Sequence, residues 1–170
     1  MPNEVFETVS SLMAVREFAD RPVAGETVRR VLEAGRLSAS SMNRQPWHFV
    51  AVRERGHLEE LGALVRTGPY IAQSAFAVAC AYEKESPFGV SDTSRAIQSM
   101  MLTAWADGVG SNWTGFGNLP EAAQALGLPE QYQLLAVIAF GYPARPVKGR
   151  KKRRPLSEVA SAERFGEPFR

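Results

Sequence analysis

The densest group of potential ligand-binding side chains in the sequence lies in one stretch, Ser38–Phe49, which reads SASSMNRQPWHF. Its hydroxyl- and amide-bearing side chains are Ser38, Ser40, Ser41, Asn43 and Gln45. A loop between two rigid elements is a common place for binding groups. Ser, Asn and Pro also form ordinary turns, so the stretch alone indicates a binding loop and a plain helix-to-strand connection about equally. Neutral groups of this kind can hold and orient a ligand through hydrogen bonds.

Side-chain arrangements that perform chemistry by themselves are missing from the sequence. There is no G-x-S-x-G sequence, and the two histidines, His48 and His57, fall at the start of an expected strand and an expected helix. One cysteine and two histidines without ligand spacing make no zinc site, so we expect no metal. There is no Walker A motif, and Gly108-Val109-Gly110 follows an expected helix, whereas the glycines of a Rossmann turn follow a strand. The remaining inventory suits a cofactor that performs the chemistry itself, so we expect no catalytic side chain.

Composition places the chain among ordinary globular proteins. At 170 residues, with 45% hydrophobic and 22% charged residues, it is most simply one domain spanning residues 1–170. No apolar run approaches the roughly 20 residues that span a bilayer, and Met1–Glu4 lack the pattern of a secretory signal. The single cysteine, Cys80, cannot form an internal disulfide, which suits a reducing compartment. We therefore expect a cytoplasmic protein that does not enter a membrane.

Hydrophobic periodicity predicts helices that alternate with strands. Apolar residues at helical spacing predict helices over 4–13, 27–37, 58–65 and 92–106, and Pro120 begins a short one. Short apolar runs predict strands over 49–52, 75–82 and 134–140, and the strand over 75–82 should be buried on both faces. Residues 108–117 are expected to form a glycine-rich loop, and residues 144–170 an extended C-terminal arm without a core pattern. This order of elements argues for mixed α/β layers.

The longest predicted helix, Asp92–Ala106, carries an apolar stripe and a weakly polar back. The stripe is formed by Ile97, Met100, Met101, Ala104 and Trp105. Because the opposite side is also mostly small or apolar, we expect a core helix whose back contacts a partner subunit. Asp92 or Thr93 is placed to cap its N-terminus.

Five stretches, in register along nearly the whole chain, together resemble the FMN-dependent nitroreductase family. The central SASSMNRQPWHF resembles the family signature Pro-Ser-x-x-Asn-x-Gln-Pro-Trp after a helix. Val15–Phe18, followed by Pro22-Val23, resembles the N-terminal Val-Arg-x-Phe, and Ser91–Phe116 resembles the core helix and its glycine loop. Phe140–Pro143 is similar to the last core strand, and Lys152–Leu156 is similar to the C-terminal basic motif.

The resemblance implies a nitroreductase-like α+β (mixed α/β) fold. Its central mixed, mostly antiparallel sheet would be flanked by helices, and its C-terminal arm would be exchanged in a homodimer. The implied activity is that of an FMN-dependent NAD(P)H oxidoreductase. In a ping-pong cycle, a hydride would pass to flavin N5 and two electrons would then pass to a nitro compound, a quinone or a similar small-molecule acceptor. No side-chain acid or base would be needed, because flavin N5 carries the chemistry.

Carried over residue by residue, the resemblance implies a cofactor site built from several segments. Arg16 would lie near the pyrimidine edge of the flavin, and the backbone of Thr114 and Gly115 would face the ring near N5. Lys152 and Arg154 would hold the phosphate through charge-assisted contacts. The cofactor-binding residues of the central loop, supplied by the partner subunit, would be Ser40, Ser41, Asn43 and Gln45.

The sequence departs from the family pattern in three places. Leu12-Met13-Ala14 stand where the family has Arg, a polar residue and Ser, so one cation and one hydroxyl on the phosphate side are missing. FMN would then bind more weakly or through the arm alone. Ala39 replaces the usual proline, which loosens the central loop. The connection Glu83–Ser91 is short where larger members insert helices, which predicts an open substrate cleft.

Two other functions fit parts of the sequence. Lys148–Arg154, which reads KGRKKRR, is a basic run of the kind that binds nucleic acid or an anionic surface. Aromatic residues do not interleave with this run, and only one helix carries a matching basic face, so we expect no nucleic-acid partner. The missing N-terminal cation also leaves open a flavin-binding protein without reductase activity.

Overall fold

The computed structural model describes residues 3–115 and 119–169. Within these residues, four strands form one sheet in the order β1-β2-β4-β3, with every neighbouring pair antiparallel. The strands are β1 (Trp47–Val52), β2 (Phe76–Glu83), β3 (Gly110–Thr114) and β4 (Tyr132–Gly141). The α-helices are α1 (Glu4–Ser11), α2 (Gly25–Arg36), α3 (Arg55–Leu64), α4 (Gly89–Ala106) and α5 (Pro120–Ala125), and the 3-10 turns are η1 (Ser41–Asn43), η2 (Pro69–Gln73) and η3 (Leu156–Glu158).

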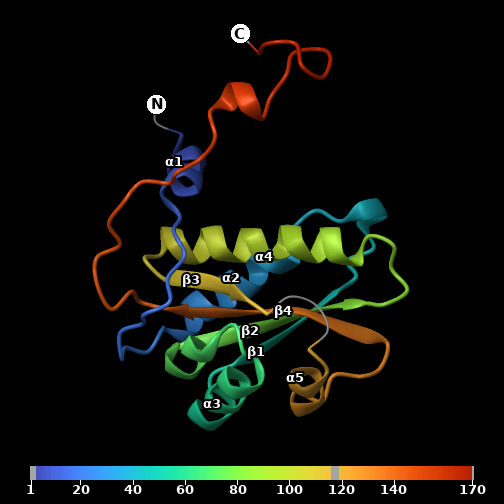
Figure 1. Ribbon diagram of the computed structural model, residues 1–170. Coiled ribbons are helices and arrows are strands. Elements are labelled where there is room, and N and C mark those ends of the chain that lie inside the picture. The colour runs from blue at the N-terminus through green and yellow to red at the C-terminus, as the bar shows by residue number, and fades with distance from the viewer. Residues whose placement is uncertain (1–2, 116–118, 170) are drawn as a thin grey trace.

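Helices cover both faces of the sheet, which gives the fold three layers (Figure 1). Helices α2 and α4 lie on one face with α1 outside them, and α3 and α5 lie on the other. Strand β2 serves both cores, because Phe76, Val78 and Cys80 pack on the α4 side while Ala77 and Ala79 pack on the α3 side. The predicted α+β class and the two-sided burial of β2 are both confirmed.

Helix α4 begins earlier than the sequence predicts. Its N-cap residue is Phe88, with no side-chain capping bond, so the expected cap at Asp92 or Thr93 is wrong. The chain turns tightly after β2, where the Gly89 N–H donates to the Ser86 carbonyl at 3.1 Å, and the helix starts at once. Asp92 and Thr93 therefore lie inside the helix and are fully buried. The expected apolar stripe is present, since Ile97 is among its fully buried residues.

The glycine-rich segment after α4 is a strand where a loop was expected. Strand β3 pairs with β4, with Asn112 opposite Ala139, and forms one edge of the sheet. Beyond it, an isolated parallel bridge joins Ala14 to Ser111, but all pairs of named strands are antiparallel, so the described sheet is antiparallel where a mixed sheet was predicted. Glycines hid the strand from sequence reasoning, yet Gly110 is needed there because a Cβ would lie 2.5 Å from the Val15 side chain. Phe116 and Gly117, the end of the expected loop, lie outside the described residues.

The remaining predicted elements agree with the structure to within three residues at each end, and the largest difference is at α3, which begins at Arg55. Beyond β4, residues 144–169 form an extended arm whose only helical turn in the described residues is η3. The arm passes α1, where the Lys151 ammonium donates to the Val9 carbonyl, and then runs away from the sheet (Figure 1). In the part of the chain that the structure describes, no helix is long and apolar enough to cross a membrane.

The buried cysteine provides a test of the core. Cys80 is fully buried on β2, and burial raises the pKa of its thiol far above the usual range, so the unreactive protonated form persists at neutral and mildly alkaline pH. We expect the native protein to react with a thiol reagent at pH 8 at least about a hundredfold more slowly than the urea-unfolded protein, because only a thiolate reacts. Fast labelling of the folded chain would contradict this packing.

Candidate functional site

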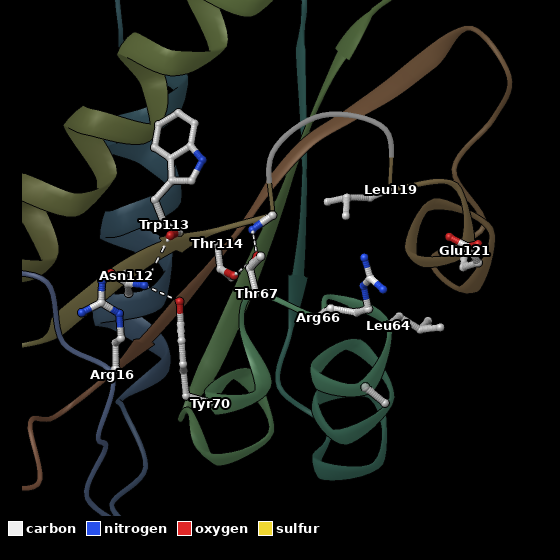
Figure 2. Close-up of a pocket in the computed structure, with 12 residues that line it drawn as sticks. Arg16, Leu64, Arg66, Thr67, Tyr70, Asn112, Trp113, Thr114, Leu119 and Glu121 are labelled. Atoms are coloured by element: carbon white, nitrogen blue, oxygen red, sulfur yellow. Dashed lines mark hydrogen bonds between the residues drawn. The ribbon is translucent and has the colours of Figure 1, made fainter.

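A cavity of about 980 Å³ opens between β3 and the helices on the α3 side of the sheet (Figure 2). Figure 2 shows one of its sides formed by Arg16, Tyr70 and Asn112, and the opposite side by Arg66 and Glu121. The other lining residues are Ala63, Leu64, Thr67, Trp113, Thr114, Gly115 and Leu119. The volume is that of a typical small-molecule site.

Alternation along β3 decides which of its side chains reach the cavity. Asn112 and Thr114 point toward it, whereas the Trp113 ring packs on the α4 side of the sheet (Figure 2). The Thr114 hydroxyl lies 3.2 Å from the Thr67 hydroxyl, and the Gly115 N–H donates to the Thr67 oxygen at 3.1 Å. Gly115 has φ +69°, a conformation that favours glycine. The end of β3 thus offers a fixed backbone donor at the cavity wall.

The side of the cavity formed by Asn112, Tyr70 and Arg16 combines an amide, a phenol and a cation. The buried Asn112 amide donates to the Tyr70 hydroxyl and to the Trp113 carbonyl at 3.3 Å. Arg16 lies beside this pair (Figure 2). Within the described residues, neither Arg16 nor Arg66 forms an ion pair with a carboxylate. Both guanidinium groups are therefore available to a ligand that carries negative charge or carbonyl oxygens.

The structure brings together three of the residues expected at the cofactor site, Arg16, Thr114 and Gly115. Sequence reasoning missed their neighbours Thr67, Tyr70, Asn112 and Arg66. The turn Gly68-Pro69 places Thr67 and Tyr70 on the cavity wall, and no local sequence pattern marks it as part of a binding site. Asn112 was hidden in the segment predicted to be a loop.

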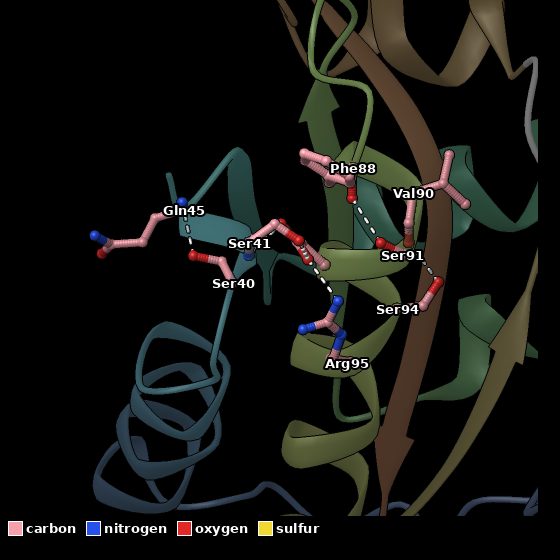
Figure 3. Close-up of polar contacts among 9 residues, drawn as sticks. Ser40, Ser41, Gln45, Phe88, Val90, Ser91, Ser94 and Arg95 are labelled. Atoms are coloured by element: carbon pink, nitrogen blue, oxygen red, sulfur yellow. Dashed lines mark hydrogen bonds and ion pairs between the residues drawn. The ribbon is translucent and has the colours of Figure 1, made fainter. Parts of the chain in front are cut away.

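The central loop does not line this cavity within one chain. Its polar groups are partly used inside the loop, where the Ser40 hydroxyl accepts from the Gln45 N–H at 3.0 Å (Figure 3). The Gln45 side-chain amide also donates to the Asn43 carbonyl at 3.1 Å. Ser41 faces α4 and donates to Asp92. Met42, Asn43 and Gln45 have positive φ angles of 52°, 54° and 52°, which is uncommon for residues other than glycine.

Lys152 and Arg154 also lie away from the cavity. Both side chains are exposed on the arm, which leaves the body of the fold beside α1 (Figure 1). A single chain therefore presents its expected cofactor-binding residues in three separate places: the cavity, the central loop and the arm. In the described part of the chain, no group of three or more His, Cys, Asp or Glu side chains is arranged to hold a metal ion. The cavity lining contains one carboxylate, Glu121.

Comparisons with known proteins agree on one family. The sequence matches the family described as Nitroreductase family over residues 12–86 and 71–142. A protein from Archaeoglobus fulgidus, provisionally named NADH dehydrogenase/NAD(P)H nitroreductase, is 32% identical over 82% of this chain and 86% of its own length. A protein with the same provisional name from Methanothermobacter thermautotrophicus is 33% identical over 83% of this chain and 78% of its own.

Solved structures show the same fold. A crystal structure from Parabacteroides distasonis, with that provisional name too, superposes with a TM-score of 0.87 at 27% identity, covering 95% of this chain and 99% of the other. A similar one from Bacteroides thetaiotaomicron gives a TM-score of 0.88 at 25% identity, covering 97% and 100% of the two chains. The architecture of this chain is therefore shared along nearly its whole length.

The close approach of two cavity-wall segments can be tested by adding one methyl group. In Gly68→Ala the new Cβ would lie 2.2 Å from the Thr114 hydroxyl oxygen, so β3 or the turn must shift. We expect the free energy of unfolding to fall by about 1–3 kcal/mol, as in overpacked sites. Gly56→Ala is the matched control, because no atom lies within 4 Å of its Cβ position on α3. Its stability should stay the same or rise by up to about 1 kcal/mol. Equal urea midpoints for both variants would contradict the packing.

Proposed function

Because the chain belongs to the nitroreductase family, we propose that it is an NAD(P)H-dependent flavin oxidoreductase that uses FMN to reduce small acceptors such as nitro compounds or quinones. The observation that carries the proposal is the cavity beside β3, which is lined by both Arg16 and Gly115. A relative of named activity supports it: an FMN reductase [NAD(P)H] from Bacillus subtilis is 23% identical over 96% of this chain and 75% of its own length.

The donor set of the cavity fits FMN. The cavity of about 980 Å³ lies in the size range of cofactor sites, and its wall offers hydrogen-bonding groups rather than acid–base pairs. When bound, FMN would supply a hydride acceptor at N5 and return two electrons to the acceptor in a ping-pong cycle. The residues of this chain would then have only to bind and orient.

Four of the cavity residues have roles that follow from their chemistry. Arg16 would donate to the carbonyl-bearing pyrimidine edge and favour negative charge there. The Gly115 N–H would serve the ring near N5, together with the backbone of Thr114. In the structure this N–H is donated to Thr67, so the threonine hydroxyl would have to release it or share it with the cofactor. Thr67 therefore keeps the donor oriented before the cofactor arrives.

The separated binding groups support a homodimer. Ser40, Asn43 and Gln45 on the loop, and Lys152 and Arg154 on the arm, do not line the cavity of their own chain, and a second copy would bring them to it. Apolar surface is available for such a contact. The exposed hydrophobic residues of α1 and of the arm include Val5, Phe6, Val9, Leu156 and Val159.

The proposal extends to acceptor range. The connection between β2 and α4 is a tight turn with no inserted helix, and the helix begins at Gly89. Nothing contributed by this segment lines the cavity. An uncovered site selects weakly by shape, so several unrelated quinones and nitroaromatics should serve as acceptors.

The direct test of the proposal is spectroscopic. The purified protein reconstituted with FMN should retain flavin absorbance through gel filtration. Anaerobic addition of NADH or NADPH should bleach that absorbance, and a quinone should restore it, because the two half-reactions are separate. Bound flavin that neither nucleotide reduces would favour a flavin-binding protein without reductase activity. A protein that retains no flavin at all would overturn the proposal.

The role of the arm can be tested by comparing FMN with riboflavin, which lacks the phosphate. Charge-assisted contacts contribute roughly 1.5–3 kcal/mol, so Arg154→Ala should weaken FMN binding about ten- to a hundredfold. Riboflavin should bind the variant and the wild type equally. Arg150→Ala, a basic arm residue outside the proposed phosphate contacts, is the control and should leave both affinities unchanged. If Arg154→Ala instead spares FMN and weakens salt-sensitive DNA binding, the arm serves nucleic acid.

A further inference from the structure

We propose that Asp92 is a positioning residue of the cofactor site: its buried carboxylate on α4 fixes the shape of the central loop, residues 40–45, that one subunit presents to the other. The role of the loop at the flavin rests on the function proposed above. The anchoring of the loop by Asp92 rests on contacts within one chain. None of these contacts involves the cavity beside β3.

Both carboxylate oxygens of Asp92 accept a hydrogen bond from the loop. The Ser41 N–H donates to Asp92 Oδ2 at 3.0 Å, and the Ser41 hydroxyl donates to Oδ1 at 3.2 Å. Arg95, one turn further along α4, supplies the compensating cation, with its guanidinium 2.9 Å from Oδ1. Asp92 is fully buried, so its charge is held by these partners rather than by water. Figure 3 shows Ser41 directed toward Arg95 and α4, while Gln45 projects the opposite way.

The conformation of the loop explains why it needs an anchor. Met42, Asn43 and Gln45 all have positive φ angles, and backbone of this kind persists only where its surroundings hold it. Four restraints are internal: the Gln45 N–H donates to the Ser40 hydroxyl, the Asn43 N–H to the Ser40 carbonyl, the Arg44 N–H to the Ser41 carbonyl, and the Gln45 side-chain amide to the Asn43 carbonyl. The Asp92 carboxylate restrains the loop from outside by accepting two hydrogen bonds from Ser41. Ser41 immediately precedes Met42, the first residue with a positive φ angle.

The Asp92 side chain does not serve as the cap of α4. Helix α4 begins at Gly89, and the Asp92 N–H makes an ordinary helical bond to the Phe88 carbonyl at 2.9 Å. The carboxylate does not cap the helix, and it contacts Ser41 and Arg95. An acidic side chain near a helix N-terminus does stabilise the helix through the dipole. The test must therefore separate loop positioning from helix stability.

Loop positioning is read directly by hydrogen exchange on the protein without cofactor. In Asp92→Asn a charged acceptor is lost, so the Ser41 amide and the following loop amides should exchange about tenfold faster or more. Asp107→Asn is the matched control. It makes the same chemical change at the other end of α4, where Asp107 pairs with Arg30 at 3.1 Å, and it should leave loop exchange unchanged. A lower melting temperature of Asp92→Asn with wild-type loop exchange would mean helix stabilisation only and would overturn the proposal.

Flavin affinity gives the second readout. Because the loop would line the ring rather than the phosphate, Asp92→Asn should weaken riboflavin and FMN alike, by about tenfold for one lost charge-assisted bond. Arg154→Ala is expected to weaken FMN alone, so the two variants differ in pattern. Unchanged riboflavin affinity in Asp92→Asn would overturn the role at the site. If the wild type binds no flavin, the proposed function fails, while loop exchange still tests the anchor.

A milder variant covers the case in which Asp92→Asn does not fold. Ser41→Ala removes only the hydroxyl bond to Asp92 and leaves the backbone bond in place. It should accelerate loop exchange by a few-fold, as expected for one weaker bond. Where Asp92→Asn does fold, the double variant should accelerate loop exchange by less than the two single effects combined, because both changes break the same contact. If Ser41→Ala leaves the exchange rate of the loop amides at the wild-type value, the Ser41–Asp92 contact does not anchor the loop.

Discussion

The packing of α4 across the sheet is the interaction on which the rest of the structure depends. Ile97, Met100 and Ala104 are fully buried on the α4 side of the sheet, in the same cluster as Phe76 and Phe140, whose rings stack at 4.7 Å. Contacts of this kind are costly to disturb, since interiors are close-packed. Helix α4 is therefore held rigidly against the sheet, and the segments that contact its two ends are held in place with it.

Each end of α4 positions one part of the proposed site. At the C-terminal end, the Val109 N–H returns to the Ala104 carbonyl at 2.8 Å, and the chain enters β3, which carries Asn112 and Thr114 to the cavity. Near the N-terminal end, Asp92 holds the central loop. One helix thus orients a cavity in its own chain and, in the proposed dimer, a loop used by the partner. The chemistry is left to the cofactor, and precision is supplied by the fold.

The parts of the fold that were predictable from sequence are those with strong patterns. The unbroken apolar run of β2 predicts a strand buried on both faces, and the apolar stripe of α4 predicts a helix packed on the core. The structure has both. Strand β3 was missed because glycine is rare inside strands, and the reason for Gly110 is a tertiary contact with Val15 that no local pattern reveals. Thr67 was missed for a similar reason, since its importance comes from Gly115, which is far along the chain.

The departure Leu12-Met13-Ala14 illustrates how backbone and side-chain roles separate. Ala14 bridges to Ser111, and the Val15 N–H donates to the Ser111 carbonyl at 2.9 Å, so this segment extends the sheet through its backbone. Apolar side chains leave that pairing intact and remove the cation and the hydroxyl of the family pattern. Of the cations that line the adjacent hollow, Arg145 lies 3.7 Å from Glu17, which leaves Arg16 without an acidic partner in the described residues. The backbone of this segment keeps its geometry while its side chains carry no charge, which is why we propose the arm as the phosphate-binding segment.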